Sequence, residues 1–139
     1  MVHALERARR HVACGGAVVC IQPHRTRRPF IAVRSGGRRV AIGPLINPVF
    51  QPLIDSADAA IAAVVARGLF TQIGRRDSHF RVRLPNPTQL HRYLHENPRP
   101  PRFRPGDKMR LLQIWRESPA GAAIEVTETM TVIGLRSTR

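Results

Sequence analysis

The chain has few aromatic residues, only two cysteines and no long apolar run, and each of these scarcities argues against a class of protein. Aromatic residues make up 5% of the 139 positions, too few for the stacking platforms typical of single-strand-binding proteins. Its two cysteines do not build a disulfide framework, and no apolar run is long enough to span a bilayer. We therefore expect a cytoplasmic protein with no membrane segment.

What the sequence does contain is positive charge. Lysine and arginine number 23 against 9 acidic residues, which gives a formal net charge of +14, and Lys108 is the only lysine. Such a charge favours nucleic acid as a partner, although arginines scattered from Arg7 to Arg139 also fit a compositional bias. A hydrophobic content of 42% predicts a folded core, and the length predicts a single domain over residues 1–139.

The first strong structural signal lies near the start of the sequence. An amphipathic helix is predicted over residues 2–13, followed by Gly15-Gly16 and an apolar run at residues 17–21. A near-continuous apolar run is typical of a strand buried on both faces of a parallel sheet. Because no earlier strand supplies its neighbours, we expect a partner polypeptide, or a preceding part of a longer chain, to complete the sheet.

Turn and cap residues divide the rest of the chain. Gly36-Gly37 predicts a tight hairpin between strands at residues 30–34 and 39–42. In that register the facing pairs are Val33 and Val40, Ile31 and Ile42, and Arg34 and Arg39. The other predicted elements are a packed proline-rich loop at 43–52, a helix capped by Asp55 or Ser56, a strand over 69–84 broken at 75–77, helices capped by Asn86 and near Asp107, and a final strand over 122–135.

Three short segments carry a family resemblance. They are a helix end with a double glycine before a strand, Ala13–Val19, a glycine and an aromatic residue that open a later strand, Gly68–Phe70, and an apolar-basic terminal strand, Thr131–Arg136. Together they resemble the C-terminal half of a class I S-adenosylmethionine-dependent methyltransferase. The resemblance implies an α/β fold, namely a partial Rossmann-like sheet of parallel strands plus an antiparallel C-terminal strand, with a β-hairpin insertion at 29–43 and a helical insertion at 86–117.

The same resemblance implies the substrate-facing half of a methyltransferase, not active alone. The cofactor site of that family needs a glycine-rich turn after its first strand, and this chain has no such turn and no strand before Ala17. We therefore expect this chain alone not to bind S-adenosylmethionine, and the cofactor to bind only if an N-terminal half completes the fold. Its own contribution would be a pocket for a small-molecule acceptor.

Candidate ligand contacts follow the predicted strands, where open α/β sheets bind ligands. Gln22, His24 and Arg25 come after the first strand, and Asn86 comes after a later one. His24 suits a base or a substrate contact, and Arg25 suits a carboxylate or phosphate. The alternatives are a solvated loop for the first three and a plain helix cap for Asn86. No catalytic residue is predicted.

A second set of candidates belongs to a nucleic-acid hypothesis. Arg99, Arg102 and Arg104 form a dense basic stretch among prolines and could contact phosphates, with a solvated linker as the alternative. His91 and His95 are four residues apart but lack a third ligand, so no metal site is predicted. Two functions therefore stand beside the methyltransferase half: a small basic nucleic-acid-binding module, and a degenerate remnant with an assembly role that self-associates through an exposed sheet edge.

Overall fold

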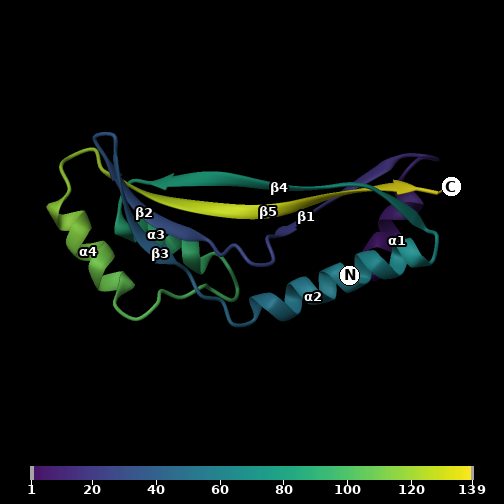
Figure 1. Ribbon diagram of the computed structural model, residues 1–139, viewed down its shortest axis with the longest axis horizontal. Helices are drawn as coiled ribbons and strands as arrows, with labels where there is room; N and C mark the ends of the chain where they lie inside the picture. Colours follow the sequence, from purple (N-terminus) through teal and green to yellow (C-terminus); the bar gives the residue numbers. More distant parts are fainter. Residues whose placement is uncertain (1, 139) are drawn as a thin grey trace. The chain divides into compact units, whose positions relative to one another are not determined.

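The computed structural model describes residues 2–138, which form an α/β fold of four helices and one five-stranded antiparallel sheet (Figure 1). The strands follow the order β1-β5-β2-β3, and β4 also pairs with β5. In chain order the elements are α1 (Val2–His11), β1 (Ala17–Pro23), β2 (Phe30–Ser35), β3 (Arg38–Pro44), α2 (Phe50–Ala66), β4 (Phe70–Leu84), α3 (Pro87–His95), α4 (Asp107–Glu117) and β5 (Ala123–Ser137).

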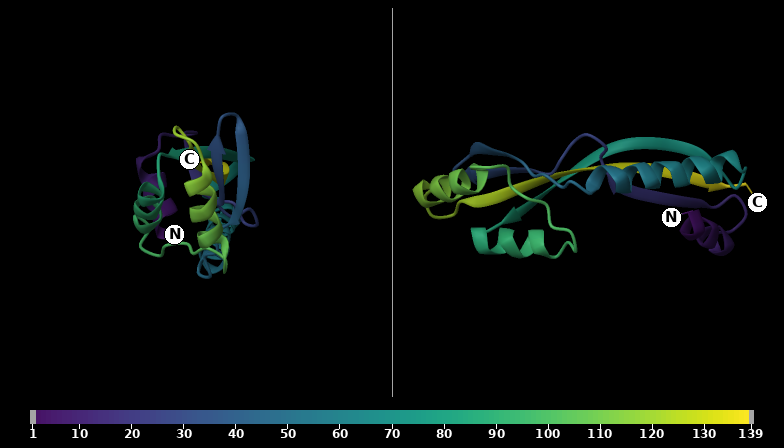
Figure 2. Two further views of the ribbon diagram at one scale, coloured as in Figure 1. Left: turned by 90° about the vertical axis from the view of Figure 1, so that its left-hand side faces the viewer. Right: turned by 90° about the horizontal axis from the view of Figure 1, so that it is seen from below.

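The chain divides into two compact units. Unit 1 holds the described residues up to Arg25, Val49–Ser78 and those from Met130 onward, and unit 2 holds Thr26–Pro48 and His79–Thr129. Strands β4 and β5, drawn as long arrows in Figure 2, each contribute residues to both units. Each unit buries its own cluster of hydrophobic side chains.

In unit 1, α1 and α2 pack on the sheet formed by β1 and parts of β4 and β5. Leu5 is the one buried residue of α1, in keeping with the apolar stripe of an amphipathic helix. The alanine-rich α2 buries Ile61 and Val64 at helical spacing. The buried residues that form one hydrophobic cluster in this unit are Leu5, Ile61, Val64, Phe70, Ile133 and Leu135.

In unit 2, α3 and α4 share one core with the strands. The strand residues that enter this core alternate along β2 and β5, so both helices of the unit contribute to one face of its sheet. The buried residues that form this hydrophobic cluster are Ile31, Val33, Ile42, Leu45, Leu90, Leu94, Leu111, Ile124 and Val126. The residues that alternate with these along each strand are more polar and point to the opposite face of the sheet.

Tyr93 of α3, the only tyrosine in the sequence, contacts β5 through Glu128. Partial burial, together with the charge and hydrogen bond of Glu128 (Oη donates to Oε1 at 3.0 Å), raises the pKa of Tyr93 to about 12. Tyrosinate absorbance should therefore titrate near 12 in the folded protein and near 10 in denaturant, and Glu128→Gln should move the folded midpoint down. Equal midpoints with and without denaturant would contradict this packing.

The predicted hairpin is confirmed in its turn and in most of its register. Gly36 and Gly37 have φ angles of 52° and 83°, which side chains other than glycine rarely adopt. Val33 pairs with Val40 and Arg34 with Arg39, as expected. A bulge between Ile31 and Ala32 then shifts the register, so Ile31 faces Gly43 and not Ile42.

The predicted interior parallel strand at residues 17–21 is wrong. Within residues 2–138, β1 pairs with β5 only, in antiparallel register, and forms an edge of the sheet. Val19 and Ile21 are 61% and 67% exposed. When every residue of a strand is apolar, hydropathy hides the alternation between its two faces and suggests burial on both.

The parallel Rossmann-like arrangement is corrected with it. The described strands pair in antiparallel fashion. Antiparallel strands can be connected by hairpins and other direct returns of the chain, so they need no crossover helix. The antiparallel C-terminal strand is confirmed, because β5 pairs with both β1 and β2.

Helix α2 begins earlier than its caps predicted. It starts at Phe50, with Val49 before it, and not after Asp55 or Ser56. Pro52 lies in its first turn, where the backbone N–H groups have no partner within the helix, so proline breaks no hydrogen bond there.

No helix among residues 2–138 is both long and apolar enough to cross a membrane.

Strand β4 is continuous through the expected break at residues 75–77. It runs from Phe70 to Leu84, and the residues between Phe70 and Val82 are exposed. Strand pairing depends on backbone groups, so a polar run can remain in a strand when a neighbour supplies the ladder. Helix α1 ends at His11, two residues before its predicted end. Helix α4 begins at Asp107 with Gly106 as its N-cap, which agrees with the cap predicted near Asp107.

Candidate nucleic-acid interface

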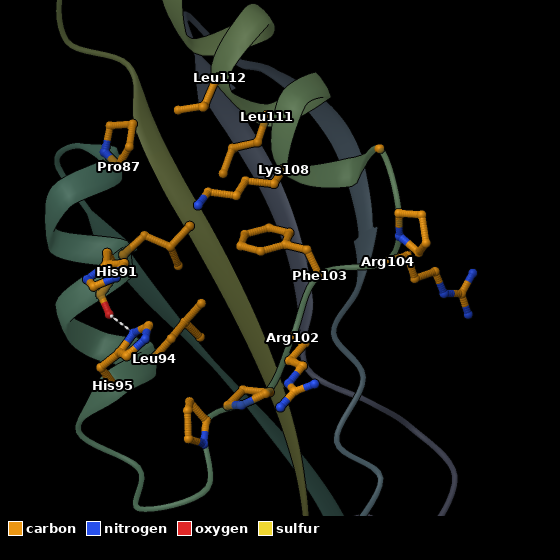
Figure 3. Close-up of a pocket in the computed structure, with 15 residues that line it drawn as sticks. Pro87, His91, Leu94, His95, Arg102, Phe103, Arg104, Lys108, Leu111 and Leu112 are labelled. Carbon is orange, nitrogen blue, oxygen red and sulfur yellow. Dashed lines mark hydrogen bonds between the residues drawn. The ribbon is translucent and has the colours of Figure 1, made fainter.

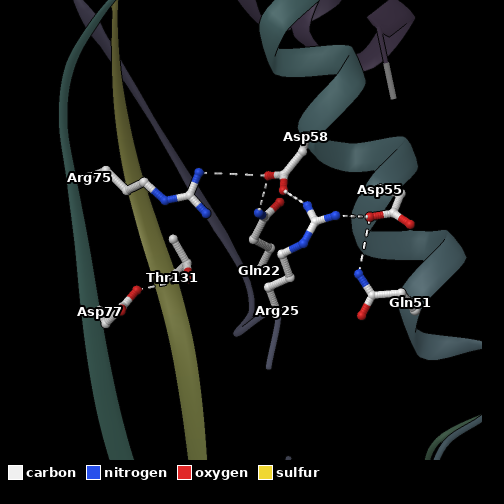
Figure 4. Close-up of polar contacts among 8 residues, drawn as sticks. All are labelled: Gln22, Arg25, Gln51, Asp55, Asp58, Arg75, Asp77 and Thr131. Atoms are coloured by element: carbon white, nitrogen blue, oxygen red, sulfur yellow. Dashed lines mark hydrogen bonds and ion pairs between the residues drawn. The ribbon is translucent and has the colours of Figure 1, made fainter. Parts of the chain in front are cut away.

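Two of the predicted ligand contacts, Gln22 and Arg25, meet at one carboxylate of unit 1 (Figure 4). Gln22 Nε2 donates to Asp58 Oδ1 at 2.7 Å, and Arg25 Nη1 donates to Asp58 Oδ2 at 3.1 Å. Arg25 Nη2 also lies 2.7 Å from Asp55 Oδ1. An incoming anion would have to compete with two carboxylates for Arg25.

The third predicted contact, His24, lies beside Asp77 of β4. The distance between His24 Nε2 and Asp77 Oδ2 is 3.1 Å, and Asp77 Oδ1 accepts a hydrogen bond from the buried Thr131 at 3.0 Å. Arg75, on the same strand, comes within 3.9 Å of Asp58. These polar contacts of unit 1 thus pair cationic groups with carboxylates and leave little excess positive charge.

Asn86 belongs to unit 2, whereas Gln22, His24 and Arg25 belong to unit 1. Its extended backbone and side-chain Oδ1, which accepts from Gln89 N at 2.9 Å, cap the N-terminus of α3. This is the helix-cap role given as its alternative. Pro87 follows at the first helical position, as its fixed φ favours.

Arg99, Arg102 and Arg104 lie in the segment between α3 and α4, and all three are exposed. The segment is held at two points. The backbones of Arg102 and Ile46 exchange two hydrogen bonds of 2.7 Å, and Asn47 Nδ2 donates to Arg99 O at 3.2 Å. The basic stretch is therefore docked against the β3–α2 connection of unit 2.

A buried carboxylate, Glu125 of β5, lies among arginines from three other strands. Its neighbours Ile124 and Val126 enter the core of unit 2, so Glu125 faces the opposite side of the sheet. There the nearest distances to it are 2.8 Å from Arg39 Nε, 3.6 Å from Arg34 Nη1 and 3.9 Å from Arg81 Nε. The Glu125 side chain is fully buried, while those of the three arginines are 38 to 53% exposed.

Three guanidinium groups share this one carboxylate, so the cluster keeps a net positive charge. Burial opposes ionisation of Glu125, but the hydrogen bond and charge of Arg39, with the charges of Arg81 and Arg34, outweigh it and hold the pKa of Glu125 below its usual value. Arg34 and Arg81 lie beyond hydrogen-bond distance of Glu125, and within residues 2–138 neither donates another side-chain hydrogen bond. Their donors are available to an anion.

Two further features define the surroundings of the cluster. The Arg39 guanidinium lies 5.7 Å from the centre of the Phe30 ring, a cation–π contact. In the strand register Glu125 pairs with Ala32, which pairs with Ala41, so small side chains cross the sheet here. We call this surface the arginine face and define it as Arg34, Arg39, Arg81, Glu125, Phe30 and, by strand alternation, Arg83.

The sequence revealed only part of this face. Facing arginines at positions 34 and 39 were predicted from the hairpin, but the acid between them was not. The signal was present, because Glu125 interrupts an apolar strand as a charged residue between Ile124 and Val126. Its partners could not be named while the neighbours of β5 were unknown.

The fold and the arginine face define a basic α/β protein built on an antiparallel sheet. In comparisons with known proteins, no family model, curated protein or solved structure matches the chain. The resemblance to a methyltransferase half stays a prediction from the sequence, and the geometry of the chain's own side chains is the basis for assigning a function.

Proposed function

We propose that this protein binds nucleic acid through phosphate contacts on the arginine face of unit 2. The observation that carries the proposal is the convergence of three arginines, from three strands, over a single buried carboxylate. Such an arrangement offers more hydrogen-bond donors than the protein itself uses. Guanidinium groups match phosphate oxygens in pairs, and a net charge of +14 draws a polyanion toward the protein.

Each member of the face has a distinct role. Glu125 holds Arg39 in place and attracts Arg34 and Arg81, which reduces the side-chain entropy that phosphate binding would otherwise cost. Arg34 and Arg81 are the phosphate contacts, because they are partly exposed and their donors are not used by Glu125. Phe30 contacts the Arg39 guanidinium, which further restricts the position of Arg39.

A role as the substrate-facing half of a methyltransferase stays the alternative drawn from the resemblance. This alternative depends on an interior parallel strand at residues 17–21, whereas β1 is an antiparallel edge strand. Completion by a partner polypeptide and self-association through a sheet edge likewise stay predictions. Calorimetry with S-adenosylmethionine tests the prediction that this chain alone does not bind the cofactor, which tight binding would overturn.

The proposal is tested with the variant R34Q/R81Q and a fluorescent oligothymidylate, by anisotropy over a series of salt concentrations. We expect affinity near 0.1 M salt to fall about tenfold or more, because two phosphate contacts are lost. The slope of log affinity against log salt should become shallower by about 1.4, at roughly 0.7 for each contact on a single strand.

Two control variants locate the binding surface. R92Q/R116Q removes the same charge from α3 and α4 of the same unit and should bind nearly as the parent does. R99Q/R102Q/R104Q tests the basic stretch between those helices. If either control loses as much affinity as R34Q/R81Q, or if the parent does not bind at low salt, the arginine face is not the interface. Circular dichroism confirms that each variant is folded.

A further inference from the structure

Unit 2 contains a pocket of about 690 Å³ between α3, α4 and the segment that joins them (Figure 3). Sites for small molecules commonly measure roughly 300–1,000 Å³. The pocket is lined by Leu90, Leu94 and Leu111, which belong to the helix-side core of the unit. It therefore lies on the opposite side of the sheet from the arginine face, and the proposed nucleic-acid binding does not use it.

The walls of the pocket are mainly apolar. Leu90, Leu94 and Leu111 are buried, and Phe103 directs its ring into the space between the two helices (Figure 3). Four prolines and Leu112 add further apolar surface. The polar lining residues are basic or histidine, and no acidic residue is among them. The pocket thus combines an apolar interior with positive charge.

Lys108, an exposed residue, supplies positive charge to the lining of this pocket. It is the only lysine of a chain whose other basic residues are arginine. Its side chain extends from α4 into the pocket, whereas the Arg104 guanidinium points away from it (Figure 3). Within residues 2–138 no acidic side chain forms an ion pair with Lys108, so its ammonium group has no protein carboxylate to neutralise it. A lysine ammonium is a compact charge that can contact a single anionic group.

We propose that this pocket binds a small molecule with an apolar body and one anionic head group, and that Lys108 contacts the head group. Leucine, phenylalanine and proline side chains would bury the apolar body, which provides affinity through removal of apolar surface from water. The ammonium group of Lys108 would fix the orientation by a charge-assisted contact. A neutral or cationic molecule of the same shape lacks that contact.

The single lysine makes the test specific. Reductive methylation with ¹³C-formaldehyde keeps the positive charge and gives one lysine signal in the NMR spectrum, that of Lys108. We expect decanoate, below its micelle concentration, to shift this signal saturably. Inorganic phosphate and an oligothymidylate, which lack an apolar chain, should leave it nearly unchanged, as should decyltrimethylammonium, which has the opposite charge. An equal response to any of these three would overturn the proposal.

Calorimetry on variants separates the charge from the cavity. K108M should weaken decanoate binding about tenfold, as expected when one charged contact is removed, and K108R should recover part of it. R116M removes a charge from the same helix but not from the pocket lining and should bind as the parent does. L112W keeps Lys108 and fills part of the pocket, so it should also weaken binding. No decanoate binding by the parent, or equal binding by K108M and R116M, would refute the assignment.

Discussion

Replacing Glu125 by glutamine is expected to lower the free energy of unfolding by about 2 kcal/mol. The side chain is fully buried and faces three arginines, so its neutralisation leaves their mutual repulsion without compensation. The loss should fall below that of a fully buried ion pair, because the arginines themselves are partly exposed and screened by water. Urea titration followed by circular dichroism measures the change.

The same variant separates stability from binding. E125Q adds one unit of positive charge to the arginine face but removes the carboxylate that positions Arg39. Because these two effects oppose each other, oligothymidylate affinity at low salt should change less than in R34Q/R81Q while stability falls. The matched control is E117Q, which neutralises an exposed acid of α4 and should change stability by no more than about 0.5 kcal/mol. Equal stability losses in the two variants would show that Glu125 contributes no more to stability than an exposed acid does.

The lowered pKa of Glu125 also predicts a pH dependence. Its carboxyl has a pKa below the ordinary 4.5 in the folded protein, so the unfolded chain takes up the proton first as the pH falls. The stabilisation is therefore complete above about pH 4.5 and is lost as the pH falls from there through the folded pKa. E125Q should lack this part of the acid sensitivity, which acid titration of both proteins would reveal.

Replacing Phe70 by alanine is expected to lower the free energy of unfolding by about 3–5 kcal/mol, the largest effect of a single substitution proposed for this chain. Phe70 is 1% exposed and packs in the core of unit 1 with residues from α1, α2 and β5. Its removal leaves a cavity that rigid helix and strand backbones only partly fill. Urea titration followed by circular dichroism again gives the measurement.

A control for Phe70 lies in the same unit. Leu53 is a hydrophobic residue of α2 that is 56% exposed, so L53A should change stability by less than about 0.5 kcal/mol. A comparable loss in L53A and F70A would mean that the burial pattern of unit 1 is incorrect. Hydrogen exchange would show in addition whether backbone amides of α2 lose protection in F70A.

Local signals predicted the parts of the fold that depend on neighbouring residues. Gly36 and Gly37 predicted the hairpin turn because few other residues adopt positive φ angles, and Asn86 predicted the start of α3 because its side chain caps the helix beside it. The bulge that displaces Ile31 was not predictable in this way. It depends on how β2 fits between β3 and β5, and therefore on residues far away in the sequence.

The candidate site shows the same division. Arg34 and Arg39 face each other in the hairpin, so their proximity followed from sequence. Glu125 is separated from both by more than eighty residues and joins them only because β5 pairs with β2. Gln22 and Arg25 were expected to face a ligand, but Asp58 of α2 reaches them across the unit.

By itself, the sequence determined the strongly basic charge, the hairpin, the cap of α3 and the presence of an apolar core, because composition and short-range backbone preferences fix these properties. Tertiary structure alone decided that β1 is an antiparallel edge strand, that Glu125 lies among three arginines, and that Lys108 enters a pocket. The reason is that strand pairing and helix docking depend on how much surface the whole chain buries, which a short segment of sequence does not reveal.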